Sequence, residues 1–266
     1  MAQPMKKVLD PPEEEEPSGV GGWVHRWVRQ PDGSYEMLET VLTPEYFLNP
    51  QLGDQMVQGA FHAAVTQMLT DLLQRHFRAQ EDVLVFSDVK LLWGVRKLRD
   101  RQPVPDVTVV RGVRHRNLAE YSTFDIVKEG VRPCLVIEVI SDGDARIRNT
   151  DLVDKVDVYE RVEIPEYLIV DPPGPATQDR FQLILYRLDA EGRYRRIAPD
   201  AEGRLLSETT GVRFAISPEG DRVLLFDAAT GERLLTSAEE ETARRNAEAE
   251  LMRLRAELGR LKKDDC

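Results

Sequence analysis

Residues 133–141 read PCLVIEVIS, and residues 151–172 read DLVDKVDVYERVEIPEYLIVDP. The first run, and EYLIVD at 166–171 within the second, are mostly apolar, as in strands covered on both faces. Between them the sequence predicts a helix over about 150–162. A strand, a helix and a second strand predict a βαβ unit with a right-handed crossover, hence a sheet with helices packed on it. The helix is indicated by the period of Leu152, Val153, Val156 and Tyr159 after the capping-type residues Asn149, Thr150 and Asp151.

Further strands and a long helix surround this unit. From Gln58 to Phe77, apolar residues recur at helical spacing, which predicts an amphipathic helix. Beyond Pro175, apolar runs separated by Gly, Asp or Pro predict antiparallel hairpins that extend the sheet. The expected fold class is α/β (α+β), with a mixed central sheet flanked by helices. The runs are VLVF at 83–86, VKLLW at 89–93, VTVV at 107–110, and then FQLILYRL, YRRI, RLL and VLLFD.

The composition changes at both ends of this region. Residues 1–22 contain four consecutive glutamates, Glu13–Glu16, between prolines and then a glycine cluster, which predicts a flexible acidic tail. Aromatic residues and prolines in residues 23–50 predict short strands or turns. We therefore expect one domain over 23–235 and a charged C-terminal helix over 236–266.

The C-terminal segment carries a short coiled-coil pattern. Leu251, Leu254, Leu258 and Leu261 alternate in steps of three and four, with mixed charges outside this seam. The apolar part covers about two heptads, fewer than a long coiled coil needs. Two interpretations stay open: the helix packs on the protein's own surface, or it mediates self-association, for example in a homodimer.

The bulk composition is that of a soluble globular protein, with 41% hydrophobic and 31% charged residues. There is no apolar run near the roughly 18 residues of a membrane span, and no secretory-type N-terminus, so we expect a cytoplasmic protein without a membrane partner. Cys134 and Cys266 are badly placed for a disulfide or a zinc site.

The net charge of −11 argues against indiscriminate binding of nucleic acid. Between Lys90 and Arg116, however, eight basic residues stand against two acidic ones. This segment could face a phosphate backbone, or it could be an ordinary solvated surface.

Two carboxylates lie within or beside apolar runs, where an acidic side chain is uncommon unless it has a partner or a function. Glu138 stands among the apolar residues of 134–140, and a buried carboxylate is costly unless a metal, a cation or hydrogen bonds compensate it. Asp106 opens the run VTVV after Pro105. The alternatives are a structural ion pair for Glu138 and a turn-capping role for Asp106. Two such carboxylates with a backbone carbonyl would suit Mg²⁺, which lowers the pKa of a bound water and polarises a phosphate.

The series PDVTVV, PCLVIEVIS and DLVDKVDVYERVEIPEYLIVDP resembles the Uma-two family of restriction-type endonucleases, in the PD-(D/E)XK nuclease superfamily. The resemblance runs from roughly residue 50 to 235, and the ending GERLLTSAEEE with a charged helical tail is also similar. It implies a restriction-endonuclease-like fold, Mg²⁺ (or Mn²⁺) held by Asp106, Glu138 and the backbone of Val139, and hydrolysis of DNA phosphodiester bonds. The matching motif positions are Asp151, Lys155, Tyr159, Glu166, Tyr167, Asp171 and Pro172.

One position departs from the superfamily pattern. The motif lysine stands two residues after the glutamate, where this chain has Ile140. We expect Lys155, on the inward side of the next helix, to replace it and assist the attacking water. The alternative is a lysine that buries its stem and reaches outward to solvent. Tyr159 is expected in the core. Candidate supporting residues are Gln58, His62, Ser141 and Arg146. Arg146 and Arg148, in the loop between strand and helix, are weaker candidates for holding phosphate.

The sequence therefore predicts a metal-dependent endonuclease with Asp106, Glu138 and Lys155 as catalytic residues and DNA as its partner. The rival is a catalytically inactive nuclease fold that assembles partners through its C-terminal helix, favoured by Ile140 and the acidic net charge. RNA or another phosphoester as substrate also stays open, because a metal and a water do not distinguish the sugar.

Overall fold

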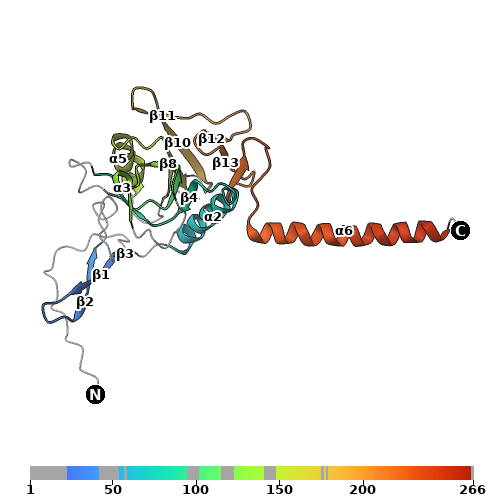
Figure 1. The fold of residues 1–266 in the computed structure, drawn as a ribbon, viewed down its shortest axis with the longest axis horizontal. Helices are drawn as coiled ribbons and strands as arrows, with labels where there is room; N and C mark the ends of the chain where they lie inside the picture. The colour runs from blue at the N-terminus through green and yellow to red at the C-terminus, as the bar shows by residue number, and fades with distance from the viewer. Residues whose placement is uncertain are drawn as a thin grey trace, which may run out of the picture.

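The fold is seen in a computed structural model, which describes residues 23–41, 54–56, 59–94, 102–114, 123–140, 148–174, 177 and 179–264. The predicted flexible tail, 1–22, lies outside these ranges. A six-stranded mixed sheet forms the centre (Figure 1). Its strands lie in the order β11-β10-β9-β8-β6-β4. Its strands are β4 (Val83–Phe86), β6 (Val107–Arg111), β8 (Pro133–Val139), β9 (Glu166–Asp171), β10 (Gln182–Leu188) and β11 (Tyr194–Arg196).

The predicted βαβ unit lies in the middle of this sheet. Strands β8 and β9 pair in parallel, and every other pair in the sheet is antiparallel. A π-helical turn, η3 (Thr150–Asp154), and helix α5 (Lys155–Arg161) connect them. Because β8 and β9 are fully buried, their apolar runs are explained by packing on both faces.

Alternation of side chains divides the core into two layers. Odd-numbered β8 residues such as Leu135 and Ile137 face helix α2 (Ala60–His76). Val136 and Ile140 pack on the opposite face with Tyr159 of α5. Glu138 belongs by alternation to this α5 face. The predicted amphipathic helix is confirmed as α2, which buries Leu69, Leu72 and Leu73 among others; Gln58 lies outside the described residues.

The expected extension of the sheet is only partly right. Strands β10 and β11 extend it, but the later runs form a separate antiparallel sheet of β12 (Leu205–Ser207), β13 (Val212–Ile216) and β14 (Val223–Asp227). Leu205, Phe214 and Leu225 from this sheet join the core on the α2 side. Folding over the main sheet buries these side chains, whereas a longer flat sheet would leave a face uncovered.

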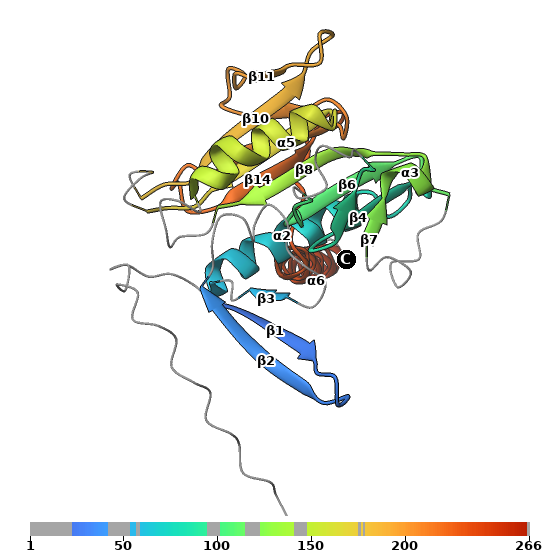
Figure 2. The ribbon, with the colours of Figure 1, turned by 90° about the vertical axis from the view of Figure 1, so that its left-hand side faces the viewer.

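Peripheral elements complete the structure. Strands β1 (Trp23–Arg29), β2 (Tyr35–Val41) and β3 (Asp54–Met56) form an antiparallel sheet whose β1-β2 hairpin points away from the main sheet (Figure 2). Strands β5 (Lys90–Leu92) and β7 (Thr123–Asp125) pair in parallel, and the short helix α3 (Ile126–Glu129) follows β7.

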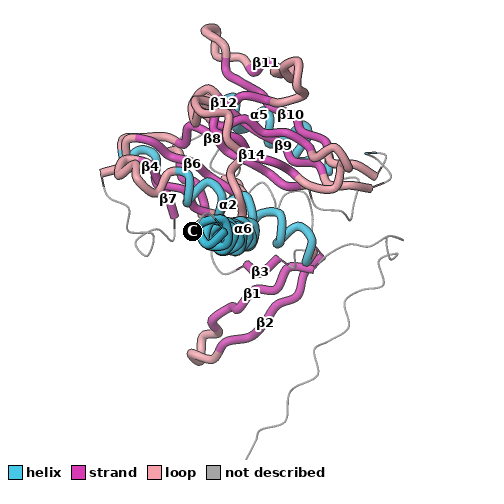
Figure 3. The backbone as a smooth tube through the Cα atoms, turned by 90° about the vertical axis from the view of Figure 1, so that its right-hand side faces the viewer, coloured by secondary structure: helices cyan, strands magenta, loops and turns pink. Residues whose placement is uncertain are grey.

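The predicted C-terminal helix is α6 (Ser237–Asp264), which projects as one long rod (Figure 1) and is seen end-on in Figure 3. Among the described helices, none combines the length and apolar character needed to cross a bilayer.

Candidate functional site

The two predicted carboxylates lie at the same end of neighbouring strands. The register pairs Val107 of β6 with Ile137 of β8, so Asp106 stands opposite Glu138. The Asp106 carboxylate accepts a hydrogen bond from the backbone N–H of Val139, at 2.7 Å. Both acids are buried, with 6% of Asp106 and 2% of Glu138 exposed. The charge of Asp106 contributes to the raised pKa of Glu138, so the two carboxylates lie near each other.

Lys155 joins these carboxylates from the first turn of α5. Its Nζ lies 3.0 Å from Glu138 Oε2 and 2.7 Å from Asp151 Oδ1. Burial favours a lower pKa of Lys155, but the charges of Asp151, Glu138 and Asp106 outweigh it and raise the pKa, so the amine is protonated. Only 3% of the residue is exposed. The alternative of a lysine reaching outward to solvent is therefore wrong.

Asp151 belongs to the cluster, although the sequence marks it only as a family motif position and a helix-capping residue and predicts no site role for it. The helical segment already includes Arg148, and Asn149 makes no side-chain capping hydrogen bond. The π-helical turn leads into α5, and Asp151 and Lys155, four residues apart, form an ion pair. Such turns recur at functional sites. The spacing of Asp151 and Lys155 was the available signal.

The two carboxylate oxygens of Glu138 contact different side chains. Tyr159 donates its hydroxyl to Oε1 at 2.7 Å, while Lys155 contacts Oε2. Burial is the main cause that raises the pKa of Glu138 well above its usual value; Asp106 and Asp151 raise it further, and Lys155 and Tyr159 only partly oppose them. Tyr159 is in the core, as expected, but its hydroxyl also serves this carboxylate, which the helical period could not indicate.

His62 approaches Asp106 from the other wall of the site, on α2. Its Nε2 lies 3.1 Å from Asp106 Oδ2, and the residue is only 5% exposed. Burial favours a lower pKa of His62, but the hydrogen bond and charge of Asp106 outweigh it and raise the pKa. Its Nδ1 has no hydrogen-bond partner among the described residues. The candidate supporting residue His62 is therefore buried beside Asp106 and does not lie on an exposed helix flank.

The remaining candidates divide into two groups. Gln58, Ser141 and Arg146 lie outside the described residues. Arg148 pairs through both guanidinium nitrogens with Asp171 at the end of β9. Arg111, in the basic segment between Lys90 and Arg116, donates hydrogen bonds to the Gln80 side chain and to the carbonyl of Thr210. These contacts give Arg111 a structural role.

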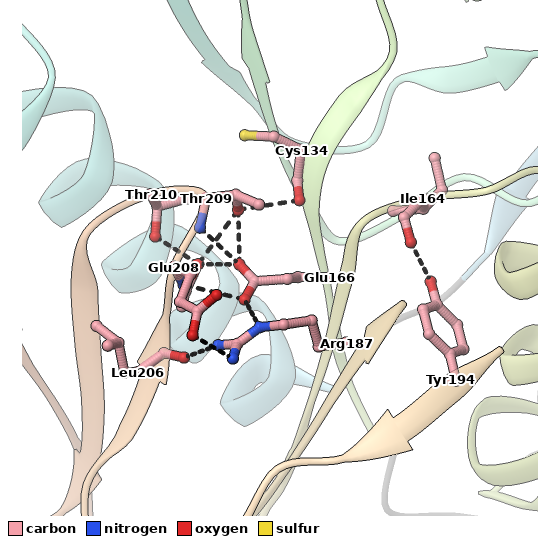
Figure 4. Close-up of polar contacts among 10 residues, drawn as sticks. Cys134, Ile164, Glu166, Arg187, Tyr194, Leu206, Glu208, Thr209 and Thr210 are labelled. Atoms are coloured by element: carbon pink, nitrogen blue, oxygen red, sulfur yellow. Dashed lines mark hydrogen bonds and ion pairs between the residues drawn. The ribbon is translucent and has the colours of Figure 1, made fainter. Parts of the chain in front are cut away.

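A second buried glutamate, Glu166, has a structural role. Glu166 of β9 is fully buried and pairs with Arg187 of β10, whose Nε is 2.8 Å from Oε1 (Figure 4). It also accepts bonds from the backbone N–H groups of Glu208 and Thr209 and from the hydroxyls of Ser207 and Thr209. This network ties the main sheet to the β12-β13 connection, and its charge is balanced by an arginine.

The charge at Glu138 is not balanced in this way. Three buried carboxylates, Asp106, Glu138 and Asp151, lie around one protonated lysine. Their oxygens are the hard ligands that Mg²⁺ prefers, and Mg²⁺ usually takes one or two carboxylates while keeping several waters. Within the described ranges, no three His, Cys, Asp or Glu side chains are arranged to bind one ion by themselves. An ion here would therefore need fewer protein ligands, such as two carboxylates and a backbone carbonyl, with water completing its shell.

A family model matches residues 44–224, which contain this whole cluster. Its description is "Uma2: Putative restriction endonuclease". The chain belongs to the Uma2 family. The resemblance found in the sequence is therefore confirmed.

One solved structure that resembles the chain is titled as that of a "putative nuclease belonging to DUF820" from Anabaena variabilis, with 18% identity and a TM-score of 0.38. The match covers 55% of this chain and 75% of that one. No curated protein matches the chain.

Proposed function

We propose that this Uma2 protein is a metal-dependent endonuclease that hydrolyses DNA phosphodiester bonds. Asp106, Glu138 and the carbonyl of Val139 hold Mg²⁺ or Mn²⁺, and Lys155 assists the attacking water. The observation that supports this best is the buried group of three carboxylates around Lys155, with Nζ 3.0 Å from Glu138 Oε2.

The charge of the cluster supports a divalent ion. If the carboxylates were fully ionised, Asp106, Glu138 and Asp151 would carry more negative charge than Lys155 offsets, and a divalent cation would compensate the excess. Without one, burial and mutual repulsion raise the pKa values of Glu138 and Asp151. When bound, the ion supplies an activated water and stabilises charge on the phosphate.

The protein groups have separate tasks in this proposal. Tyr159 fixes one oxygen of Glu138, and the N–H of Val139 fixes one oxygen of Asp106. Lys155 replaces the motif lysine, because Ile140 is buried in the apolar layer on the α5 face. Its ammonium, held by Glu138 and Asp151, offers a positive charge beside the attacking water.

The first test is cleavage of plasmid DNA by the full chain with Mg²⁺, with Mn²⁺ and with a chelator. Glu138→Gln should reduce the rate at least about a hundredfold, because it removes a charged group from the reaction centre. The matched control is Glu163→Gln, at an exposed glutamate after α5 that pairs with Arg132. Undiminished cleavage by folded Glu138→Gln would refute the assignment.

The second test separates metal binding from catalysis. Calorimetry with Mn²⁺ should give heat for the wild type and much less for Asp106→Asn. Absence of binding, with or without DNA, would favour the inactive interaction protein instead. Parallel assays with DNA and RNA then establish the substrate, and cleavage of RNA alone would refute the DNA assignment.

A further inference from the structure

Helix α6 is anchored at its start and unsupported further along. Thr236 and Glu239 form a capping box: the Thr236 N–H bonds to Glu239 Oε2 at 3.0 Å, and the Glu239 N–H bonds back to Thr236 Oγ1 at 3.3 Å. Arg75 of α2 reaches the carbonyl of Leu235 and pairs with Glu240. Past these contacts the helix leaves the body of the protein (Figure 1). These contacts fix the base of the helix.

The far half of α6 carries an apolar stripe that none of the described residues covers. Leu251 and Leu254 are both 48% exposed. Packing on the protein's own surface is therefore not observed for these residues. Ala247 precedes them in the same register, and Leu258 and Leu261 continue it in the sequence, so the spacing is that of positions a and d of a heptad.

Charges beside the stripe indicate both the partner and its direction. With Leu251 at position a, Glu250 and Glu257 occupy g, and Arg255 and Lys262 occupy e. In a parallel pair, each g residue faces the e residue five positions later in the other helix. Glu250 then meets Arg255, and Glu257 meets Lys262. An antiparallel pair with the leucines aligned joins g to g and e to e. Glu257 and Arg255 then each face their own copy, and only the Glu248–Lys262 pair is favourable.

We infer that α6 pairs with α6 of a second copy of this chain, in parallel, and that the chain is a homodimer. The complementarity is within one sequence, so no other partner is required to explain both the apolar stripe and the flanking charges. The inference does not depend on the proposed nuclease activity.

The mass of the full chain in solution tests this directly. Sedimentation should show mass rising with concentration from 30.3 kDa towards twice that value, because a seam of about two heptads gives a reversible association. Leu251→Glu together with Leu254→Glu should abolish it. The control is Met252→Glu: Met252 is 70% exposed and stands at position b, outside the seam. A wild type that stays monomeric, or a double variant that still dimerises, would overturn the inference.

The direction of pairing needs its own measurement. Glu250→Arg or Arg255→Glu alone should weaken association, and the two together should restore it. In a Cys266→Ser background, Ala247→Cys should form an intermolecular disulfide under mild oxidation, because parallel pairing brings the two copies of position 247 together. Dimerisation without this disulfide would rule out the parallel arrangement.

Discussion

Lys155→Met should destabilise the protein strongly and in a pH-dependent way. The methionine keeps the length of the side chain but removes the cation that lies 3.0 Å from Glu138 and 2.7 Å from Asp151. Breaking a buried pair by removing one partner costs about 3–5 kcal/mol, because the other charge stays buried. At about 2–4 °C per kcal/mol, the melting temperature should fall by roughly 6–20 °C.

The pH dependence follows from the direction of the carboxylate shifts. The pKa values of Glu138 and Asp151 are already raised in the folded state, and removing Lys155 raises them further. At pH values between the unfolded and the folded pKa of these carboxyls, the folded variant binds more protons than the unfolded chain. Its free energy of unfolding therefore falls as pH rises through this window. The difference from wild type should be large at about pH 8 and smaller at about pH 5.

Thermal and urea unfolding at both pH values measure this effect. The control is Lys128→Met, at an exposed lysine of α3. Should Lys155→Met fail to fold, the double variant with Glu138→Gln removes one buried charge and should recover part of the loss. If Lys155→Met instead melts with the wild type at about pH 8, the buried ion cluster cannot be as described.

Three further outcomes are expected. In Cys266→Ser, the remaining thiol of Cys134 should resist alkylation at about pH 8 until the protein unfolds, since burial raises the pKa of Cys134 to about 11. Rapid labelling of the native protein would contradict its burial. Arg187→Met should cost about 3 kcal/mol in urea unfolding by leaving Glu166 without its cation, while DNA cleavage by the folded fraction is retained. Thr236→Ala should cost about 1 kcal/mol of local helix stability, seen as faster amide exchange in the first turn of α6 but not in the central sheet.

The two proposals have a joint consequence. Cleavage of both strands of a duplex is simplest for a two-fold dimer with one site for each strand. A variant with Leu251→Glu and Leu254→Glu should then still nick DNA, while linear product forms more slowly than with wild type. If the monomeric variant forms linear product as fast as wild type, double-strand cleavage does not need the dimer.

Much of the sheet could be predicted because its pattern is local. Strands β8 and β9 are marked by apolar runs, and α2 by its helical period. The order β12-β13-β14 as a separate sheet could not be predicted, because hairpins have the same local pattern whether they extend a sheet or fold over it. That choice depends on which apolar face remains uncovered.

The candidate site shows the same division. An acid within an apolar strand pointed to Glu138, and the Uma2 resemblance pointed to Asp106 and Lys155, whose catalytic roles stay predictions. The contacts of Tyr159 and His62 had no local signal, because each residue fits an ordinary helix face and its partner is far away in the sequence.

The sequence by itself determined the βαβ unit, the long helices and the family, since these follow from periodicity and from motif residues close together in the chain. The tertiary structure decided which charges share one buried space. Desolvation and Coulomb attraction depend on distances through space, and no spacing along the chain fixes these when the residues come from different elements.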